Sequence, residues 1–325
     1  MSTRTLVDDP AAVVPRARPP ITFVGGTGRS GTHVLAELIS RHRRYALVPV
    51  ESRFHVNPKG FPDVLSGAAT PQEFVRKLRR FWWYRVPAGE PLPAVLPRLR
   101  LGRATRGLHK VATREQFDEA VARFEAAAAE GALDRACRRL FLDLLWPIAA
   151  QNGKRGIVEM STHNVAHSHE LARLFPDAKL IHTVRDGRDA GSSKVEKRQR
   201  SHHPRDVVEG VAWWLERIER AERSVAEAPD GYVLTISLDE LALGEREESF
   251  ARLLNFLHIE KPARMRTFFD QQINAQNASR GRWRAGLTEA EQSAVTRAYE
   301  RAIERLEDQG FPSGSLLRRV YERLG

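Results

Sequence analysis

The sequence predicts an α/β fold, in which a P-loop-like parallel sheet is flanked by helices and the C-terminus is helical. Three observations lead to this prediction. Short apolar runs alternate along the chain with segments of helical periodicity, which is typical of a parallel sheet. The first apolar run, Ile21 to Val24, leads through a glycine-rich turn into an amphipathic helix. The 325 residues are enough for one large domain with insertions.

Each strand and helix of this fold has its own signal in the sequence. Apolar runs predict strands at Ile21 to Val24, Ala46 to Val50, Gly156 to Met160, Lys179 to Val184 and Tyr232 to Ser237. Helical patterns follow most of them, at Thr32 to Arg41, Val165 to Phe175, Arg188 to Arg198 and Glu248 to Leu257. A long amphipathic helix, Arg205 to about Ala228, precedes the last strand.

Capping boxes and helical patterns predict a helical insertion at residues 61–150, between two strands of the sheet. Thr70 and Glu73 form a capping box around Pro71 and open a helix through Tyr84. Thr113 and Gln116 form a second box before an alanine-rich helix that ends near Gly131, and residues 134–148 give a third helix. The proline-rich, basic residues 87–110 between them predict a loop. We expect the insertion to shape the acceptor pocket of a domain that spans residues 21–325, after a flexible tail at 1–20.

Composition limits the partners and the compartment. The net charge of +11 suits anionic partners such as nucleotides or sulfated and phosphorylated molecules. Cys137 is the only cysteine, so no intramolecular disulfide can form. The first 20 residues lack the apolar core of a signal peptide, and no stretch approaches the length of a membrane span. We therefore expect a cytoplasmic protein without a transmembrane segment.

The glycine-rich turn predicts a site for a phosphate-like group, because backbone amides at such a turn and the positive end of the helix dipole favour anions. A nucleotide kinase needs G-x-x-x-x-G-K-[ST] here. Aligned on Gly26 and Gly31, the chain has Thr32 in place of the lysine and His33 in place of the hydroxyl. The cation comes earlier, at Arg29, so a P-loop kinase is the less favoured alternative.

A second anion site is predicted where the strand Lys179 to Val184 ends. Arg185 emerges at the carboxyl edge of the sheet, where open α/β folds bind ligands. Ser193 follows eight residues later and can return toward it, and an arginine with a serine hydroxyl suits a terminal phosphate. The alternative is a surface ion-pair cluster made by Arg185, Asp186, Arg188 and Asp189.

Taken together, the two sites resemble the sulfotransferases that use 3′-phosphoadenosine 5′-phosphosulfate (PAPS). The closest resemblance is to the tyrosylprotein sulfotransferase branch and its bacterial relatives. It is carried by GG-x-x-RSGT at 25–32, Glu51, ARLFP-x-AK followed by VRDGR at 172–188, LLNFL at 253–257 and GRW at 281–283. The resemblance covers residues 21–51 and 158–287, and leaves the insertion outside.

The resemblance implies the roles of individual residues. The 5′-phosphosulfate would lie on Gly28, Arg29, Ser30, Gly31 and Thr32, with Arg29 offsetting charge on the transferred group. Arg185 and Ser193 would hold the 3′-phosphate, and Arg282 and Trp283 would belong to a loop that closes over the nucleotide. Ser30 and Thr32 also suit a helix start without any ligand. No metal is implied.

Two residues are candidates for the general base that takes the proton from the acceptor. Glu51 follows the second strand and should lie near Arg29, although it could equally be the ion-pair partner of Arg53. His55 is the rival, because its ordinary pKa is close to neutral. Where the family often has a lysine at the bridging oxygen, this chain has Met160, so either Arg29 acts alone or His163 helps.

Other readings of the sequence are weaker. His163, His167 and His169 have a spacing that can bind zinc, but no glutamate follows as in H-E-x-x-H. The aromatic groups at 81–84 and 213–214 suit either the core or an acceptor pocket. No nucleic-acid motif occurs.

The predicted function is sulfuryl transfer from PAPS to a hydroxyl or amine of a small-molecule, lipid-linked or peptide acceptor. A basic nucleotide or polyanion binder without catalysis is the other alternative.

Overall fold

The computed structural model describes residues 19–84, 106–196 and 203–325. Within them, five parallel strands form one sheet in the order β2-β3-β1-β4-β5. The strands are β1 (Ile21–Gly26), β2 (Tyr45–Leu47), β3 (Gly156–Met160), β4 (Lys179–Val184) and β5 (Val233–Ser237). The predicted α/β fold with a parallel sheet is confirmed. The tail at 1–18 and most of the predicted loop at 87–110 lie outside the described residues.

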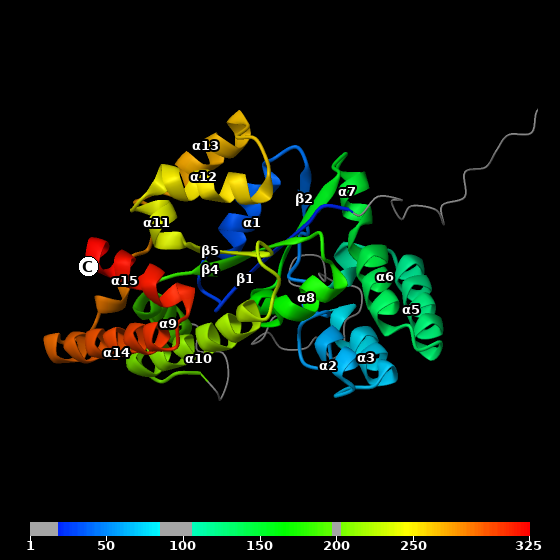
Figure 1. Cartoon of the computed structure of the whole chain (residues 1–325), viewed down its shortest axis with the longest axis horizontal. Coiled ribbons are helices and arrows are strands. Elements are labelled where there is room, and N and C mark those ends of the chain that lie inside the picture. Colours follow the sequence, from blue (N-terminus) through cyan, green and yellow to red (C-terminus); the bar gives the residue numbers. More distant parts are fainter. Residues whose placement is uncertain (1–18, 85–105, 197–202) are drawn as a thin grey trace, which may run out of the picture.

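Helices cover both faces of this sheet (Figure 1). One face packs against α1 (Thr32–Ser40), α11 (Leu238–Ala242), α12 (Arg246–Leu257) and α13 (Ala263–Gln272). The other face is covered by α8 (Ser168–Leu174), α9 (Gly187–Glu196) and α10 (Val207–Ala226). Successive side chains of β1 point to opposite faces of the sheet, so they pack in two separate cores. Val24 lies in the core on the α1 face, whereas Phe23 packs against Phe141 and Phe175 in the core on the other face.

The described residues between β2 and β3 are helical, as the sequence predicts. They form α2 (Phe61–Ser66), α3 (Pro71–Lys77), a π-helical turn (Leu78–Trp82), a short 3₁₀ turn (Leu108–Lys110), α5 (Arg114–Ala129), α6 (Leu133–Leu145) and α7 (Pro147–Gln151). Both capping boxes form, at Thr70 with Glu73 and at Thr113 with Gln116. The helix expected at 134–148 is divided before Pro147, which has no N–H to continue the hydrogen-bond ladder.

Several element boundaries differ from those predicted, and three of the differences have a clear local reason. The second strand ends at Leu47. The Val48 N–H still donates to the Val158 carbonyl oxygen of β3 at 2.9 Å, but Pro49 has no N–H and cannot continue the hydrogen bonding between the strands. The helix expected from Val165 begins as a 3₁₀ segment at Thr162 and becomes α8 only at Ser168. The long helix starts later, at Val207, because the Asp206 side chain accepts the Glu209 N–H and caps it.

The C-terminal part is helical and builds a third core. A 3₁₀ turn (Arg282–Arg284), α14 (Glu289–Asp308) and α15 (Pro312–Leu324) pack their apolar side chains with those of α9 and α10. Trp214 is fully buried there. Of the aromatic group at 81–84, Trp82 and Trp83 are buried, while Phe81 and Tyr84 are more than half exposed. The aromatic clusters therefore serve the core in part only.

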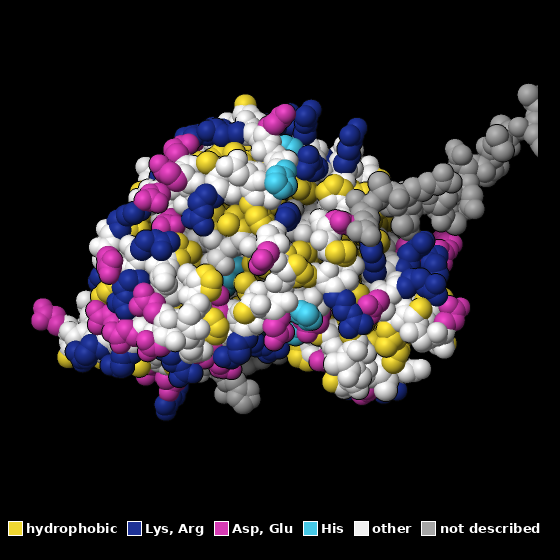
Figure 2. All heavy atoms as spheres, in the orientation of Figure 1, with side chains coloured by type: hydrophobic (Ala, Val, Ile, Leu, Met, Phe, Trp, Pro, Cys, Tyr) yellow, Lys and Arg dark blue, Asp and Glu magenta, His cyan; other side chains and the backbone are white. Residues whose placement is uncertain are grey.

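The surface carries charges of both signs. Figure 2 shows Lys and Arg side chains spread over the visible face and mixed with Asp and Glu.

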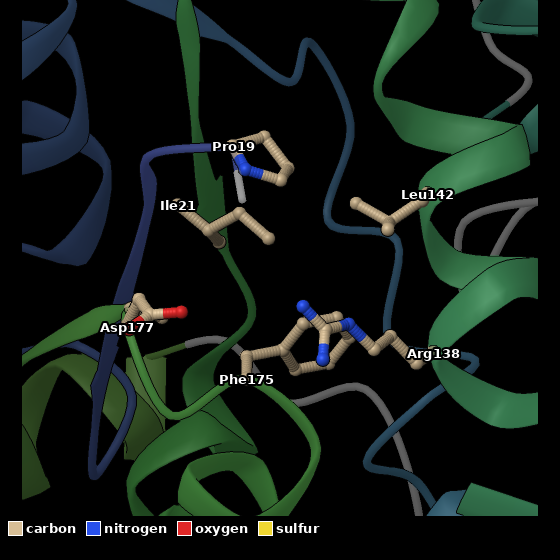
Figure 3. A pocket seen from close by; sticks show the side chains of 7 residues that line it. Pro19, Ile21, Arg138, Leu142, Phe175 and Asp177 are labelled. Atoms are coloured by element: carbon tan, nitrogen blue, oxygen red, sulfur yellow. The ribbon is translucent and has the colours of Figure 1, made fainter. Parts of the chain in front are cut away.

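A hollow of about 10 Å³ lies at the start of β1, lined in part by Pro19, Ile21 and Phe175 (Figure 3). Such a volume holds one water molecule at most, and it lies at the opposite end of β1 from Gly26. Among the described residues, no helix has both the length and the apolar character that crossing a bilayer requires.

Candidate functional site

The predicted site residues meet at the carboxyl edge of the sheet. In the register of the strands, Gly26 at the end of β1 pairs with Thr183 of β4, and Val24 pairs with Met160 of β3. The loop after β1 therefore lies between the segments that follow β3 and β4. The chain runs from β1 to β2 on one side of the sheet and from β4 to β5 on the other side. The strand order therefore reverses between β1 and β4, and such a switch point is where open α/β sheets bind ligands.

The loop after β1 has the backbone shape of an anion-binding turn. Gly28 (φ 84°), Arg29 (φ 63°) and Gly31 (φ 86°) are left-handed, and only Ser30 between them is not. Gly31 is also the N-cap of α1, and no side chain caps the first turn. A Cβ at Gly31 would lie 2.6 Å from Leu238 Cδ2, so this close approach requires glycine. Uncapped amides in such a turn form a concavity for negative charge.

Two hydroxyls that the sequence places on this loop are buried. Ser30 is 0% exposed and its Oγ hydrogen-bonds Thr183 Oγ1 at 3.1 Å, while Thr183 Oγ1 donates to Gly25 O at 2.9 Å. Thr32 is also buried, at the first position of α1. The Ser30 hydroxyl therefore anchors the loop onto β4, which leaves the loop backbone and Arg29 to face a ligand.

Arg29, Arg185 and Ser193 come together although they lie far apart in the sequence. Arg29 Nε donates to Ser193 Oγ at 2.9 Å, and Arg185 Nη1 donates to the carbonyl oxygen of Arg29 at 3.3 Å. Burial and the neighbouring Arg185 lower the pKa of the Arg29 guanidinium. Two guanidiniums held this close suit a ligand with several negative charges. We call Arg29, Arg185 and Ser193 the donor cluster.

The rest of the VRDGRD segment is structural. Arg188 and Asp186 form a buried ion pair at 2.7 Å, each 2% exposed. The Arg188 guanidinium carbon lies 4.8 to 5.0 Å from the ring centroids of Trp283, Tyr299 and Tyr321. The predicted alternative of a surface ion-pair cluster is therefore wrong, because the pair is buried and Arg185 forms no ion pair with any described carboxylate.

The loop at 281–283 is tied to the donor cluster through Asp189. Asp189 accepts hydrogen bonds from the backbone N–H groups of Gly281 at 2.9 Å and Trp283 at 3.2 Å. Arg282 is exposed and lies 4.0 Å from Glu196. The Trp283 ring is only 2% exposed and packs in the C-terminal core, so it supports the loop from beneath. That this loop closes over a nucleotide stays a prediction.

Glu51 lies between two groups of positive charge. Its carboxylate forms an ion pair with Arg53 and lies 3.5 Å from His33 Nε2, and its side chain is 9% exposed. It is also close enough to Arg29 to oppose the fall in the Arg29 pKa. Both interpretations of Glu51 are therefore compatible with the structure, since the ion pair with Arg53 also holds the carboxylate beside Arg29.

His55 is not placed to act as a base. Its ring is 0% exposed and packs edge-on against Phe141, with centroids 5.1 Å apart. Its Nε2 lies 2.9 Å from Asn164 Oδ1 and 3.5 Å from Glu159 Oε2. Because no face of the ring reaches the surface, the expectation that His55 could take a proton from an acceptor is corrected.

His55 belongs instead to a buried polar network centred on Glu159, which the sequence analysis missed. Glu159 accepts from Ser52 Oγ at 2.8 Å, Ser161 Oγ at 2.6 Å and Asn164 Nδ2 at 2.7 Å. Burial alone would raise the Glu159 pKa, but His55 and these donors hold it below its usual range. The network joins the segment that carries Glu51 to the segment after β3. A carboxylate inside an otherwise apolar strand was the signal for it.

The family lysine has no positively charged counterpart in Met160, which occupies its position, or in His163 nearby. Met160 is 5% exposed and packs in the core beside α1. Burial, together with Arg53 and Arg217, lowers the pKa of His163 to about 4, so its ring is neutral at pH 7. Arg29 is the charged group on this loop. Any help from His163 would come from a neutral ring, so both alternatives for the leaving group stay predictions.

Residues of α10 also border the loop, among them Trp213, one of the aromatic residues that the sequence assigns to the core or to an acceptor pocket. A Cβ on Gly28 would lie 3.9 Å from Trp213 Cη2, and the Arg217 guanidinium lies 4.8 Å from the centre of the Trp213 ring. Helices α9 and α10 cross here at Gly191 and Gly210, where a Cβ on Gly191 would lie 2.6 Å from the Gly210 carbonyl carbon. This close crossing sets Trp213 beside the loop.

No group of three or more metal-ligating side chains occurs in the described ranges. His167 lies 3.7 Å from Glu170 in an i,i+3 pair, and His169 Nδ1 lies 2.9 Å from the Glu227 carbonyl. The absence of a metal stays a prediction.

The comparison with protein families decides the assignment. A model described as the sulfotransferase family matches residues 20–263. The chain belongs to the sulfotransferase family. No curated protein sequence matches it significantly.

Several solved sulfotransferase structures are similar to this one. The sulfotransferase domain of the olefin synthase from Synechococcus PCC 7002 is 16% identical, with 88% of this chain and 96% of that chain covered and a TM-score of 0.47. Sulfotransferase STF9 from Mycobacterium avium is 18% identical, with coverages of 91% and 77% and a TM-score of 0.43. Mouse sulfotransferase SULT7A1, solved with PAP, is 13% identical, with coverages of 93% and 89% and a TM-score of 0.44.

Proposed function

We propose that this sulfotransferase moves a sulfuryl group from PAPS to a hydroxyl or amine of its acceptor. The observation that carries the proposal is the donor cluster, in which Arg185, after β4, is hydrogen-bonded to Arg29 of the uncapped, left-handed loop after β1. Arg185 donates to the carbonyl oxygens of Arg29 and Ser279 rather than to a carboxylate. Such a guanidinium can exchange its weak partners for a phosphate at little expense.

The donor cluster suggests how PAPS binds. The loop at 28–32 would take the 5′-phosphosulfate on its amides and on Arg29. Arg185 and Ser193, both in contact with Arg29, would take the 3′-phosphate. The loop at 281–283, held by Asp189, would lie against the nucleotide through its backbone and Arg282. The relation to the tyrosylprotein sulfotransferase branch rests on the sequence motifs and belongs to the proposal.

The chemistry needs one base and one cation. The acceptor oxygen attacks the sulfur and forms a new S–O bond, while the S–O bond to the 5′-phosphate breaks. Glu51 takes the acceptor proton, and the bridging oxygen leaves with its electron pair on 3′-phosphoadenosine 5′-phosphate (PAP). Arg29 offsets the charge that develops on this oxygen. Most of the rate gain then comes from holding the donor, the acceptor and the charges in line.

Calorimetric titration with PAP, beside ATP with magnesium, tests the proposal. We expect PAP to bind more tightly than ATP, and Arg185→Ala to weaken PAP binding about 10- to 100-fold, as expected for lost charge-assisted hydrogen bonds. Adenosine 5′-monophosphate, which lacks the 3′-phosphate, should lose much less affinity in the same variant. Equal affinity for PAP and adenosine 5′-monophosphate in the wild-type protein would refute the donor assignment.

A further inference from the structure

A second group of basic side chains lies next to Glu51, apart from the three residues of the donor cluster. It consists of Arg53 after β2, His163 in the 3₁₀ segment after β3, and Arg217 on α10. The three are close enough to affect one another, because Arg53 and Arg217 both lower the pKa of His163, and Arg53 lowers that of Arg217. We call these three residues the acceptor-side cluster.

Contacts place the acceptor-side cluster within the site. Arg53 forms the ion pair with Glu51, and its backbone N–H donates to Ser161 Oγ at 3.0 Å. Arg217 stacks on Trp213, whose ring edge lies beside Gly28 of the loop. The cluster thus reaches from the candidate base to the phosphate loop. Glu51 has both Arg29 and Arg53 as charged neighbours.

Each member of the cluster keeps a polar atom without a partner. Arg53 Nε, Arg217 Nε and His163 Nδ1 are buried, and none has a hydrogen-bond partner among the described residues. A buried donor without a partner destabilises a protein by about 1–3 kcal/mol, so unpaired donors that converge in one place are unusual. Three such atoms beside the base indicate a group that accepts hydrogen bonds and carries negative charge.

Stacking keeps the guanidinium of Arg217 in place without a counter-ion. Its charge lies over the Trp213 ring, and the ammonium group of Lys194 lies 5.2 Å from the centre of the same ring. Arg217 forms no ion pair with a carboxylate within the described ranges, whereas many other arginines of this chain do. A side chain that is oriented but not neutralised is prepared for an anion from outside.

We propose that the acceptor carries an anionic group, a carboxylate or a phosphate, which binds to the acceptor-side cluster and so presents the acceptor hydroxyl to Glu51. The inference rests on the proposed function, because it assigns the substrate class of the same site. Arg53 and Arg217 supply the positive charge, and neutral His163 supplies a hydrogen bond. Neutral acceptors of the same shape bind more weakly, because they leave these donors unpaired.

Three pairs of compounds, each an acid and its neutral counterpart, test the proposal by equilibrium binding. The pairs are 4-hydroxyphenylacetate with tyrosol, glucuronate with glucose, and glycerol 3-phosphate with glycerol. The third pair separates phosphate from carboxylate recognition. Each titration is run with and without saturating PAP, so that the anion preference is read even where PAP fails to bind.

We expect at least one acid to bind about tenfold or more tightly than its neutral partner, as expected for charge-assisted hydrogen bonds. Arg217→Gln should reduce this preference to about threefold or less, and Arg217→Lys should restore part of it. Arg301→Gln, which removes an equal charge from the exposed face of α14, should leave the preference unchanged. PAP affinity should stay the same in all three variants.

Two results would overturn the proposal. One is that no acid binds better than its neutral partner. The other is that a preference survives in Arg217→Gln; if that variant also weakens the binding of PAP, or of PAPS, the cluster is part of the donor site. Failure of the wild-type protein to bind PAP would instead count against the proposed function and would leave the acid–neutral comparison readable.

Discussion

Arg185 and Arg188 lie three residues apart in VRDGRD, and the fold gives them opposite roles. Arg188 is 2% exposed, binds Asp186 through two nitrogens and is surrounded by three aromatic rings. Among the described residues, Arg185 donates only to backbone carbonyl oxygens, and it lies beside a second arginine. A guanidinium that is neutralised by a buried carboxylate holds the fold together, whereas one that has only carbonyl partners remains available to a ligand.

The difference lies in the neighbouring elements rather than in the local sequence. Asp186 faces the C-terminal helices, where Tyr299 of α14 and Tyr321 of α15 cover Arg188. Arg185 leaves the strand end toward the loop after β1. The helical C-terminus thus assigns one arginine to the core and leaves the other at the site.

The largest expected effect comes from removing the buried partner. Arg188→Ala removes the 2.7 Å ion pair from the buried Asp186 carboxylate and leaves it the more distant Arg280, at 3.8 Å. This loss should lower the free energy of unfolding by about 3–5 kcal/mol. Arg185→Ala should lower it by about 1 kcal/mol or less, because its carbonyl partners can bond water. Urea unfolding of the two variants measures both values. Similar losses in both variants would contradict the assignment of roles.

A smaller effect concerns Asp239, the carboxyl beside the same pair. Burial and Asp186 raise the pKa of Asp239 to about 6, although it accepts the Asp186 N–H at 2.8 Å and lies 3.7 Å from Arg280. Its ordinary value is near 4. The protonated carboxyl is favoured in the folded state, so its contribution to stability is complete below about pH 4 and is lost as the pH rises through about 6.

Asp239→Asn should remove this dependence. Between pH 4 and pH 7 the wild-type protein should lose about 3 kcal/mol of stability relative to the variant. Thermal or urea unfolding of both proteins across this range measures the difference. Parallel curves for the two proteins would show that Asp239 does not titrate in this window.

The smallest effect on stability is expected for the Glu51–Arg53 ion pair. Its side chains are 9% and 22% exposed, so the pair is less buried than Arg188 with Asp186. Glu51→Gln should change the free energy of unfolding by about 1 kcal/mol or less, as for other partly solvated pairs. Sulfuryl transfer to an acceptor from the panel above should nevertheless fall about 10²- to 10⁴-fold, because the base is lost. A large loss of stability with unchanged transfer would make Glu51 a structural residue.

Much of the fold follows from local signals. The strands at 156–160 and 179–184 have the predicted bounds, because buried parallel strands are continuous apolar runs. The two capping boxes in the insertion form as predicted, since a cap needs only four neighbouring residues. Errors occur where the local signal is mixed, as at Pro49 after β2 and at the 3₁₀ segment before α8.

The candidate site is predictable where a motif follows a strand end. Arg29, Arg185 and Ser193 belong to such motifs, and the parallel sheet brings them to one edge. His55 could not be judged from the sequence. It was a candidate base because the ordinary pKa of histidine is near neutral, but it is fully buried, in part against Phe141 of the insertion. Arg217 carries no motif, and only the packing of α10 on the loop brings it near Glu51.

The sequence by itself determined the parallel α/β fold, the glycine-rich turn after β1 and the arginine that follows β4, because glycines, apolar runs and strand ends act over short distances along the chain. The tertiary structure decided which charges are neutralised. It pairs Arg188 with Asp186 beneath the C-terminal helices, buries His55 against Glu159, and leaves Arg185 and Arg217 without carboxylate partners among the described residues. Burial and counter-charges are set by elements distant in sequence, and these two quantities determine whether a charged side chain stabilises the fold or binds a ligand.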